Sequence, residues 1–70
     1  MNIQESKDTL GSISDGCFFL DTEGDLCVKL RHLGSGREQY RTLRSGRLDV
    51  ADGNLQVTPV ALTDITFKIL

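Results

Sequence analysis

The sequence predicts a small all-β domain, either a five- to six-stranded antiparallel sheet or a partly open barrel, built from hairpins. Two observations lead to this fold class. Short apolar runs are separated by turn signals about every ten residues, a spacing typical of small sheet proteins. No longer stretch repeats its apolar positions with the period of a helix. The 70 residues are the size of one domain, so we treat residues 1–70 as a single unit.

The N-terminal part of the chain carries the weakest strand signals. Residues 1–9 are mostly polar and are either a frayed tail or a short edge strand. Leu10 and Ile13 then offer two apolar anchors, and Asp15-Gly16 is typical of a turn. The hairpin of residues 17–31 follows this turn.

Residues 17–31 predict the hairpin on which the rest of the fold depends. Gly24 suits the left-handed position that closes a three-residue loop, residues 22–24, because it has no Cβ. Side chains then alternate between the two sides of each strand. The core side carries Phe18 opposite Val28, Leu20 opposite Leu26, and Leu30. The other side carries Cys17, Phe19, Cys27, Lys29 and Arg31.

The middle of the chain combines turns with a poorly patterned strand. By composition, residues 32–37 form a flexible loop. Residues 38–44 predict a third strand in which neither side is consistently apolar. We therefore expect a bulge near Tyr40 or exposure of this strand on both faces.

Three further strands follow. Their inner sides are marked by Leu48 and Val50, by Leu55 and Val57, and by Ile65, Phe67 and Ile69. The Asp52-Gly53 dipeptide between the first two of these strands is a strong hairpin-turn signal. The predicted core consists of Phe18, Leu20, Leu26, Val28, Leu30, Leu48, Val50, Leu55, Val57, Ile65, Phe67 and Ile69.

The charge of the chain is unevenly distributed. The net charge is −2, yet residues 29–47 hold six basic residues against Glu38 alone, a local balance of +5. The remainder holds two lysines against nine acidic residues, a balance of −7. A basic stripe on an acidic body disfavours nonspecific binding to bulk nucleic acid but permits a focused anion site.

Several functional classes lack their sequence signatures. The two cysteines and one histidine show no metal-ligand spacing, so we expect neither a metal nor a cofactor. Cys17 and Cys27 are diagonal to each other in the hairpin, which predicts two free thiols. His32 lies past the predicted strand end and no nucleotide fingerprint is present, so we expect a protein that is not an enzyme. Without a signal peptide or a membrane-spanning run, the expected location is the cytoplasm.

Two Ser-Gly-Arg triplets bracket the third strand, at residues 35–37 and 45–47. A glycine-containing turn exposes backbone N–H groups, serine adds a donor and arginine supplies a planar fork, and phosphate and carboxylate sites are made of these parts. The alternative is a pair of ordinary turns followed by solubilising arginines. Tyr40 stacks on a base if the ligand is a nucleotide and otherwise belongs to the core. The candidate ligand-binding residues are Arg31, Ser35, Gly36, Arg37, Tyr40, Arg41, Arg44, Ser45, Gly46 and Arg47.

The outer side of the hairpin predicts self-association. Cys17, Phe19 and Cys27 form an apolar strip that needs a cover, either the chain's own N-terminal segment or a second subunit, and for so small a domain we favour the subunit. A homodimer is the expected form, because two-fold pairing is the commonest closed symmetry. Arg37 and Arg47 stand about 20 Å apart along one strand, so they meet only across such a two-fold axis.

Four short motifs lie between residues 16 and 60: Gly-Cys-Phe at 16–18, Leu-Cys-Val-Lys at 26–29, Arg-Ser-Gly-Arg-Leu at 44–48 and Val-Thr-Pro-Val at 57–60. In these motifs the chain resembles a group of short proteins encoded by bacteriophages. The strand at residues 40–42 departs from the group's pattern, since it is basic where apolar residues are expected. The resemblance implies a small SH3-like barrel and a phage accessory role, with no catalytic residues to carry over.

The resemblance and the basic region lead to one functional prediction. We expect a non-catalytic phage accessory protein that inhibits a host defence system through the region from Arg31 to Arg47. Its partner is a host protein or a small phosphorylated nucleotide, and no membrane is involved. The alternatives are a small nucleic-acid-binding barrel and a structural subunit of the virion.

Overall fold

The structure, a computed structural model, describes residues 7–61 and contains six strands and one short 3₁₀ turn in that range. The elements are β1 (Asp8–Thr9), η1 (Leu10–Ser12), β2 (Phe18–Leu20), β3 (Leu26–Gly34), β4 (Arg37–Thr42), β5 (Leu48–Asp52) and β6 (Gln56–Val60). All strand pairs are antiparallel, and the strand order is β1-β6-β2-β3-β4-β5. The predicted all-β class and hairpin construction are therefore confirmed, with a single sheet that does not close into a barrel.

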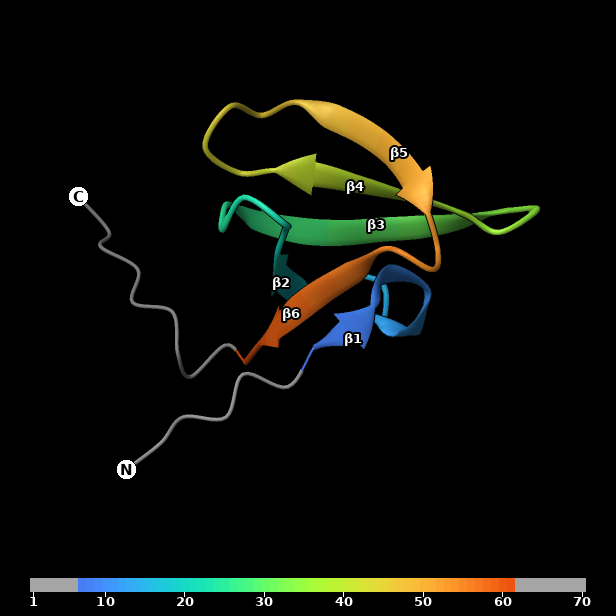
Figure 1. Ribbon diagram of the computed structural model, residues 1–70. Helices are drawn as coiled ribbons and strands as arrows, with labels where there is room; N and C mark the ends of the chain where they lie inside the picture. Colours follow the sequence, from blue (N-terminus) through green and yellow to red (C-terminus); the bar gives the residue numbers. More distant parts are fainter. Residues whose placement is uncertain (1–6, 62–70) are drawn as a thin grey trace.

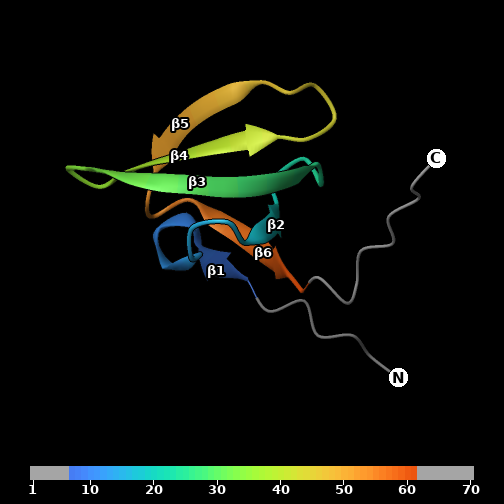
Figure 2. The ribbon, with the colours of Figure 1, turned by 180° about the vertical axis from the view of Figure 1, so that it is seen from behind.

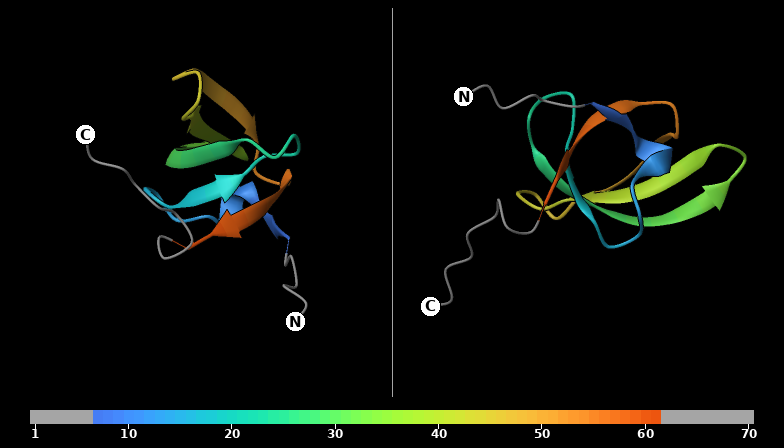
Figure 3. Two further views of the ribbon diagram at one scale, coloured as in Figure 1. Left: turned by 90° about the vertical axis from the view of Figure 1, so that its left-hand side faces the viewer. Right: turned by 90° about the horizontal axis from the view of Figure 1, so that it is seen from below.

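The sheet is strongly curled. β3 and β4 are its longest strands and lie side by side, with β5 next to β4 (Figure 1). Seen from behind, β1 and η1 lie on the β6 side of the molecule, away from β5 (Figure 2). Seen from below, the chain bends round so that β6 lies across from β3 and β4 (Figure 3). This curl gives the sheet an inner, concave face and an outer face.

The central hairpin forms in the predicted register. Phe18 pairs with Val28, Phe19 with Cys27 and Leu20 with Leu26. Gly24 has a φ of +83°, the left-handed conformation that the three-residue loop requires. The Asp21 carboxylate fixes this loop, because its Oδ1 accepts hydrogen bonds from the backbone N–H groups of Glu23 and Asp25, both at 2.9 Å.

The predicted flexible loop at residues 32–37 is wrong, because β3 runs to Gly34 and β4 begins at Arg37. Ser35 and Gly36 make the whole connection as a two-residue hairpin turn, with φ values of +53° and +73°. Two successive residues with positive φ form the type of turn whose twist matches that of paired antiparallel strands. Glycine next to serine thus specifies a tight turn here rather than flexibility.

The bulge expected near Tyr40 lies on the neighbouring strand. Lys29 pairs with Tyr40 and Arg31 pairs with Gln39, so Leu30 is an extra residue in β3. A second shift lies between His32 and Gly34. Such bulges increase twist and change which face a side chain points to.

The Asp52-Gly53 turn joins β5 to β6 but does not make a hairpin. Leu55 N–H donates to the Asp52 carbonyl at 3.0 Å, which closes a turn as the dipeptide predicts. β6 then lies toward the opposite end of the strand order, where it pairs with β1 and β2 instead of β5. β5 is therefore left at the end of the sheet.

The side of the hairpin predicted to be the outer one, which carries Phe19 and Cys27, is the side that forms the domain's core. The core consists of Leu10, Ile13, Phe19, Cys27 and Val57, each with at most 6% of its surface exposed. Of the predicted core residues, Val57 is buried and Leu55 packs against the cluster, and Leu10 and Ile13 anchor the chain as expected.

The remaining predicted core residues lie elsewhere. Phe18, Leu20, Leu26, Val28 and Leu30 are only partly buried, and Leu48 and Val50 are exposed by 51% and 47%. Ile65, Phe67 and Ile69 lie outside the described residues. The prediction chose the wrong face because both sides of the hairpin carry large apolar side chains. The η1 turn and Val57 of β6 cover only the side that holds Phe19.

At the N-terminal end, Asp8 and Thr9 of β1 pair with Val57 and Gln56 of β6. For these two residues the edge-strand alternative is therefore correct. Within residues 7–61, no helix has the length and apolarity needed to cross a membrane.

Candidate partner-binding surface

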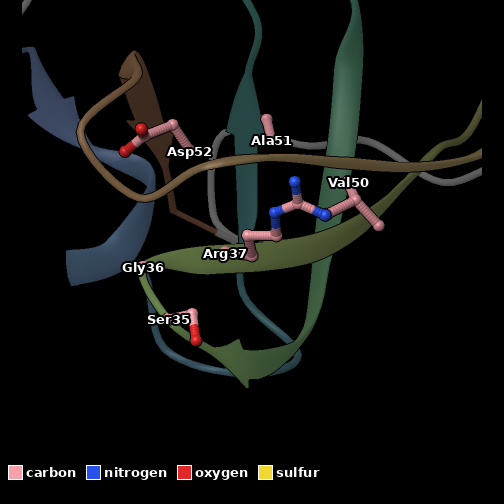
Figure 4. A pocket seen from close by; sticks show the side chains of 6 residues that line it. All are labelled: Ser35, Gly36, Arg37, Val50, Ala51 and Asp52. Carbon is pink, nitrogen blue, oxygen red and sulfur yellow. The ribbon is translucent and has the colours of Figure 1, made fainter.

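The first Ser-Gly-Arg triplet lies at the tip of the β3–β4 hairpin. Ser35, Gly36 and Arg37 border a hollow of about 350 Å³ together with Val50, Ala51 and Asp52 of β5. In Figure 4 the Arg37 guanidinium extends toward Val50, whereas the Asp52 carboxylate points away from it. Arg37 is exposed, and among the described residues it makes no ion pair. Its charge is thus available to a partner.

The second triplet uses its own donors within the β4–β5 turn. The N–H of Gly46 donates to the Thr42 carbonyl at 2.8 Å, and the N–H of Arg47 donates to the Ser45 hydroxyl at 3.2 Å. An anion nest needs such N–H groups free to point at the ligand. The Ser45 turn therefore fits the alternative of an ordinary turn.

The surroundings of Arg47 also disfavour an anion. Arg47 Nε forms an ion pair with Asp49 at 3.3 Å. The hollow of about 310 Å³ beside it is bordered by the carboxylates of Asp21, Glu23, Asp25 and Asp49. A phosphate placed there would meet several like charges. The two triplets lie at opposite ends of β4, as the strand length predicts, and do not share a pocket.

Two further candidate arginines lie on the strands, and one lies in a turn. Arg31 Nε donates to the Gln39 side chain at 3.3 Å, and Arg41 Nη1 donates to the Gly46 carbonyl at 2.8 Å. Arg44 is exposed in the turn after β4. Three of the candidate arginines lie on the outer face of the sheet. Arg37 and Arg41 alternate with Gln39 along one side of β4, and Arg31 of β3 is paired with Gln39.

Tyr40 faces inward and belongs to the core. Its ring packs edge-to-face against Phe19, with 5.5 Å between ring centroids and 68° between planes. Burial raises the pKa of its phenol, and the nearby Asp49 carboxylate adds to that effect. The core alternative for Tyr40 is therefore correct, since its ring is partly buried and packs against the core cluster.

The predicted interface strip of Cys17, Phe19 and Cys27 is wrong. Phe19 and Cys27 have none of their surface exposed and belong to the domain's own core, and only Cys17 is exposed. The strip thus finds its cover within the chain, from η1 and β6. Any contact between subunits must use another surface.

Both cysteines are free, as predicted. The Cys27 sulfur contacts the Asp25 carbonyl at 3.5 Å, the Thr42 hydroxyl at 3.7 Å and the Asp21 carboxylate at 3.9 Å. Burial raises the pKa of the Cys27 thiol, which disfavours the reactive thiolate. Among residues 7–61, no group of His, Cys, Asp and Glu side chains is arranged to hold a metal ion.

A buried ion pair on the inner face is the feature that sequence reasoning missed. Lys29 and Glu38 each have about 2% of their side chains exposed, and their Nζ and Oε1 atoms are 2.7 Å apart. Lys29 Nζ also donates to the carbonyls of Ile13 and Leu10, at 2.9 and 3.2 Å. All three ammonium donors therefore have acceptors, which is the condition for burying such a charge.

His32 completes this cluster from the rim. Because Leu30 is an extra residue in β3, Lys29 and His32 both face β4 on the side of Glu38. His32 Nδ1 contacts Glu38 Oε2, while most of its ring is exposed. The hydrogen bond from Lys29 holds the pKa of Glu38 below its usual value, and the contact with His32 acts in the same direction. The cluster ties η1, β3 and β4 together.

The outer face of β3, β4 and β5 carries apolar and basic side chains in rows across the strands. Val28, Arg41 and Leu48 form one row, and Arg31, Gln39 and Val50 form the next. Arg37 lies further along β4 on the same face, because it has the same parity as Gln39 and Arg41. We call these seven residues the outer arginine face.

Comparisons with known proteins do not assign this chain to a family. No family model, curated protein or solved structure matches it significantly.

Proposed function

We propose that the protein is a non-catalytic binding domain that recognises an acidic, partly apolar surface of another protein through its outer arginine face. One observation carries the proposal. Leu48 and Val50, exposed by 51% and 47%, lie beside the arginines of β3 and β4 on one continuous sheet face. Exposed apolar side chains combined with arginine are the composition of protein-binding surfaces, where arginine is enriched and lysine is depleted.

The geometry favours a protein partner over a small nucleotide. Arg41 and Arg47 are engaged with the Gly46 carbonyl and Asp49, at opposite sides of the β4–β5 turn. A phosphate site needs several donors to converge on one point, as in a nest or an arginine fork. The arginines are instead spread along two strands, which suits a partner that covers a wide surface.

We propose a non-catalytic protein because two of its potentially reactive side chains, Cys27 and His32, already have structural contacts. The Cys27 thiol is buried among Asp21, Asp25 and Thr42. His32 contacts Glu38, whose other oxygen is paired with Lys29. These groups have structural partners, and within residues 7–61 the Cys27 thiol and the His32 ring do not contact each other.

The resemblance in sequence to short phage proteins extends this proposal. The partner is then a bacterial host protein, and binding inhibits the defence process in which that protein acts. This extension rests on the sequence motifs, whereas the binding face rests on the described strands.

The test compares three forms of the purified protein as bait in a bacterial lysate. Arg37→Glu reverses a charge on the outer arginine face, and Arg44→Glu makes the same change in the exposed turn. We expect the wild type and Arg44→Glu to retain one protein partner, which is then purified and titrated. Arg37→Glu should weaken that binding by roughly tenfold or more, the usual effect of losing an arginine hot spot.

Other outcomes would contradict the proposal. Equal loss of binding in both variants would show a response to overall charge rather than to the face. Binding to DNA or RNA that weakens steeply with salt would support the nucleic-acid alternative. Presence of the protein in purified virions would support the structural alternative.

A further inference from the structure

The outer edge of β5 offers unpaired backbone groups. Thr42 N–H donates to the Arg47 carbonyl at 3.0 Å, and Gly53 N–H donates to the Gly36 carbonyl at 2.7 Å. The backbone groups of Arg47 and Gly53 thus point toward β4. Because this direction alternates along a strand, the backbone groups of Asp49 and Ala51 point toward β4 as well. The backbone N–H and C=O groups of Leu48 and Val50 therefore point away from β4, where no described strand pairs with them.

This edge lacks most of the devices that keep edge strands apart. β5 contains no proline and no lysine, and its register with β4 is continuous from Leu48 to Asp52 without a bulge. Two of its three outward-facing side chains, Leu48 and Val50, are apolar and about half-exposed, and the third, Asp52, lies at its end. A regular, apolar edge of this kind is a template for another strand. The edge ends at Asp52, whose carbonyl accepts the hydrogen bond from Leu55.

We propose that β5 pairs with β5 of a second copy of the chain, antiparallel and centred on Val50, so that two sheets join across a two-fold axis. In this register Val50 exchanges two hydrogen bonds with Val50 of the other copy. The N–H of Asp52 donates to the Leu48 carbonyl of the other copy, and symmetry repeats this bond. Each copy thus supplies both donors and acceptors, as a two-fold contact requires.

The charges on β5 select this register over its neighbours. Centring on Asp49 would place two aspartates directly opposite each other, and like charges in that position destabilise a sheet. Centring on Ala51 would place Leu48 opposite Asn54, which lies in the turn after β5. Centring on Val50 places Leu48 opposite Asp52 and Val50 opposite itself, so no like charges meet.

A second copy is the occupant that the domain itself favours. The buried apolar cluster among residues 7–61 has five members, and a chain of 70 residues buries only about 60% of the surface that its unfolded form exposes. Small domains commonly gain stability by associating. Because pairing occurs in the plane of the sheet, the outer arginine face stays open and becomes continuous across the axis. The dimer does not depend on the proposed partner, and either can fail without the other.

The first measurement is the mass in solution, by light scattering or sedimentation over a wide concentration range. We expect the wild type to form a dimer. Val50→Lys should raise the dissociation constant roughly tenfold or more, because it places two lysines opposite each other. Leu33→Lys is the matched control, since Leu33 is 42% exposed but lies on β3. It should leave the dimer unchanged, and circular dichroism checks that both variants fold.

The second measurement is amide exchange in the wild type. The Asp49 amide faces β4 and should be protected at every concentration, whereas the Val50 amide should gain protection only as the dimer forms. Three results would overturn the proposal: a wild type that stays monomeric throughout, a dimer that Val50→Lys leaves intact, or a Val50 amide protected in the monomer. The last would mean that another segment of the same chain occupies the edge.

Discussion

Replacing Lys29 by methionine tests the buried ion pair most severely. Methionine keeps the unbranched shape of the side chain but removes the ammonium group, which has acceptors on Glu38, Leu10 and Ile13 at 2.7–3.2 Å. Removing one partner of a buried pair costs about 3–5 kcal/mol, because the other charge is left without compensation. A 70-residue domain has a total stability of only about 4–10 kcal/mol. The variant should therefore lose a large part of its stability.

Urea denaturation followed by far-ultraviolet circular dichroism measures this loss. For small domains the free energy of unfolding falls by about 1 kcal/mol per molar urea at the low end of the range. At that slope the unfolding midpoint should fall by about 3 M or more. The double variant Lys29→Met with Glu38→Leu should recover much of the loss, since replacing both charges by apolar groups is often neutral. A loss below about 1 kcal/mol for Lys29→Met alone, within the range of exposed pairs, would refute the buried-pair interpretation.

Three further predictions concern pH, turn geometry and thiol chemistry. The hydrogen bond from Lys29 holds the pKa of Glu38 below its ordinary 4.5. The ionised Glu38 therefore contributes stability above pH 4.5, and this contribution is lost as the pH falls through the lower pKa of the folded state. Unfolding midpoints measured from pH 7 downward should show a loss of stability in acid that Glu38→Gln reduces. Gly24→Ala should cost about 1–2 kcal/mol, because its φ of +83° is strained for a residue with a Cβ, whereas Thr22→Ala in the same loop should change the midpoint little. A thiol reagent should label Cys17 at once but Cys27 only on unfolding, and equal rates in the native protein would contradict the burial of Cys27.

The hairpin register could be predicted from the sequence because local rules decide it. A glycine in the third loop position and strict alternation fix which residues pair, and Phe18 does pair with Val28. Those rules do not say which side of the sheet is covered. That choice depends on η1, which precedes the hairpin, and on β6, which follows it by more than twenty residues, and both pack against Phe19.

The buried cluster could not be predicted for a related reason. Lysine is among the residues least often buried, so alternation alone assigns Lys29 to solvent. Its burial needs Glu38 on the next strand and two carbonyls from the segment around η1, and the bulge at Leu30 brings His32 to the same side. The sequence also cannot tell which of the two Ser-Gly-Arg triplets has free donors. A triplet such as Ser45-Gly46-Arg47 has the same sequence pattern whether its backbone N–H groups are free or are used within the turn.

Surface footprinting tests the central claim, that the outer arginine face binds a partner, most directly. The protein is labelled with a photoreactive carbene reagent alone and in bacterial lysate, and the labelling of each residue is compared. We predict that lysate reduces labelling of Val28, Leu48 and Val50, whereas exposed Leu33 on the β3 bulge is labelled as before. Unchanged labelling of all four residues, or protection of Leu33 alone, would contradict the account.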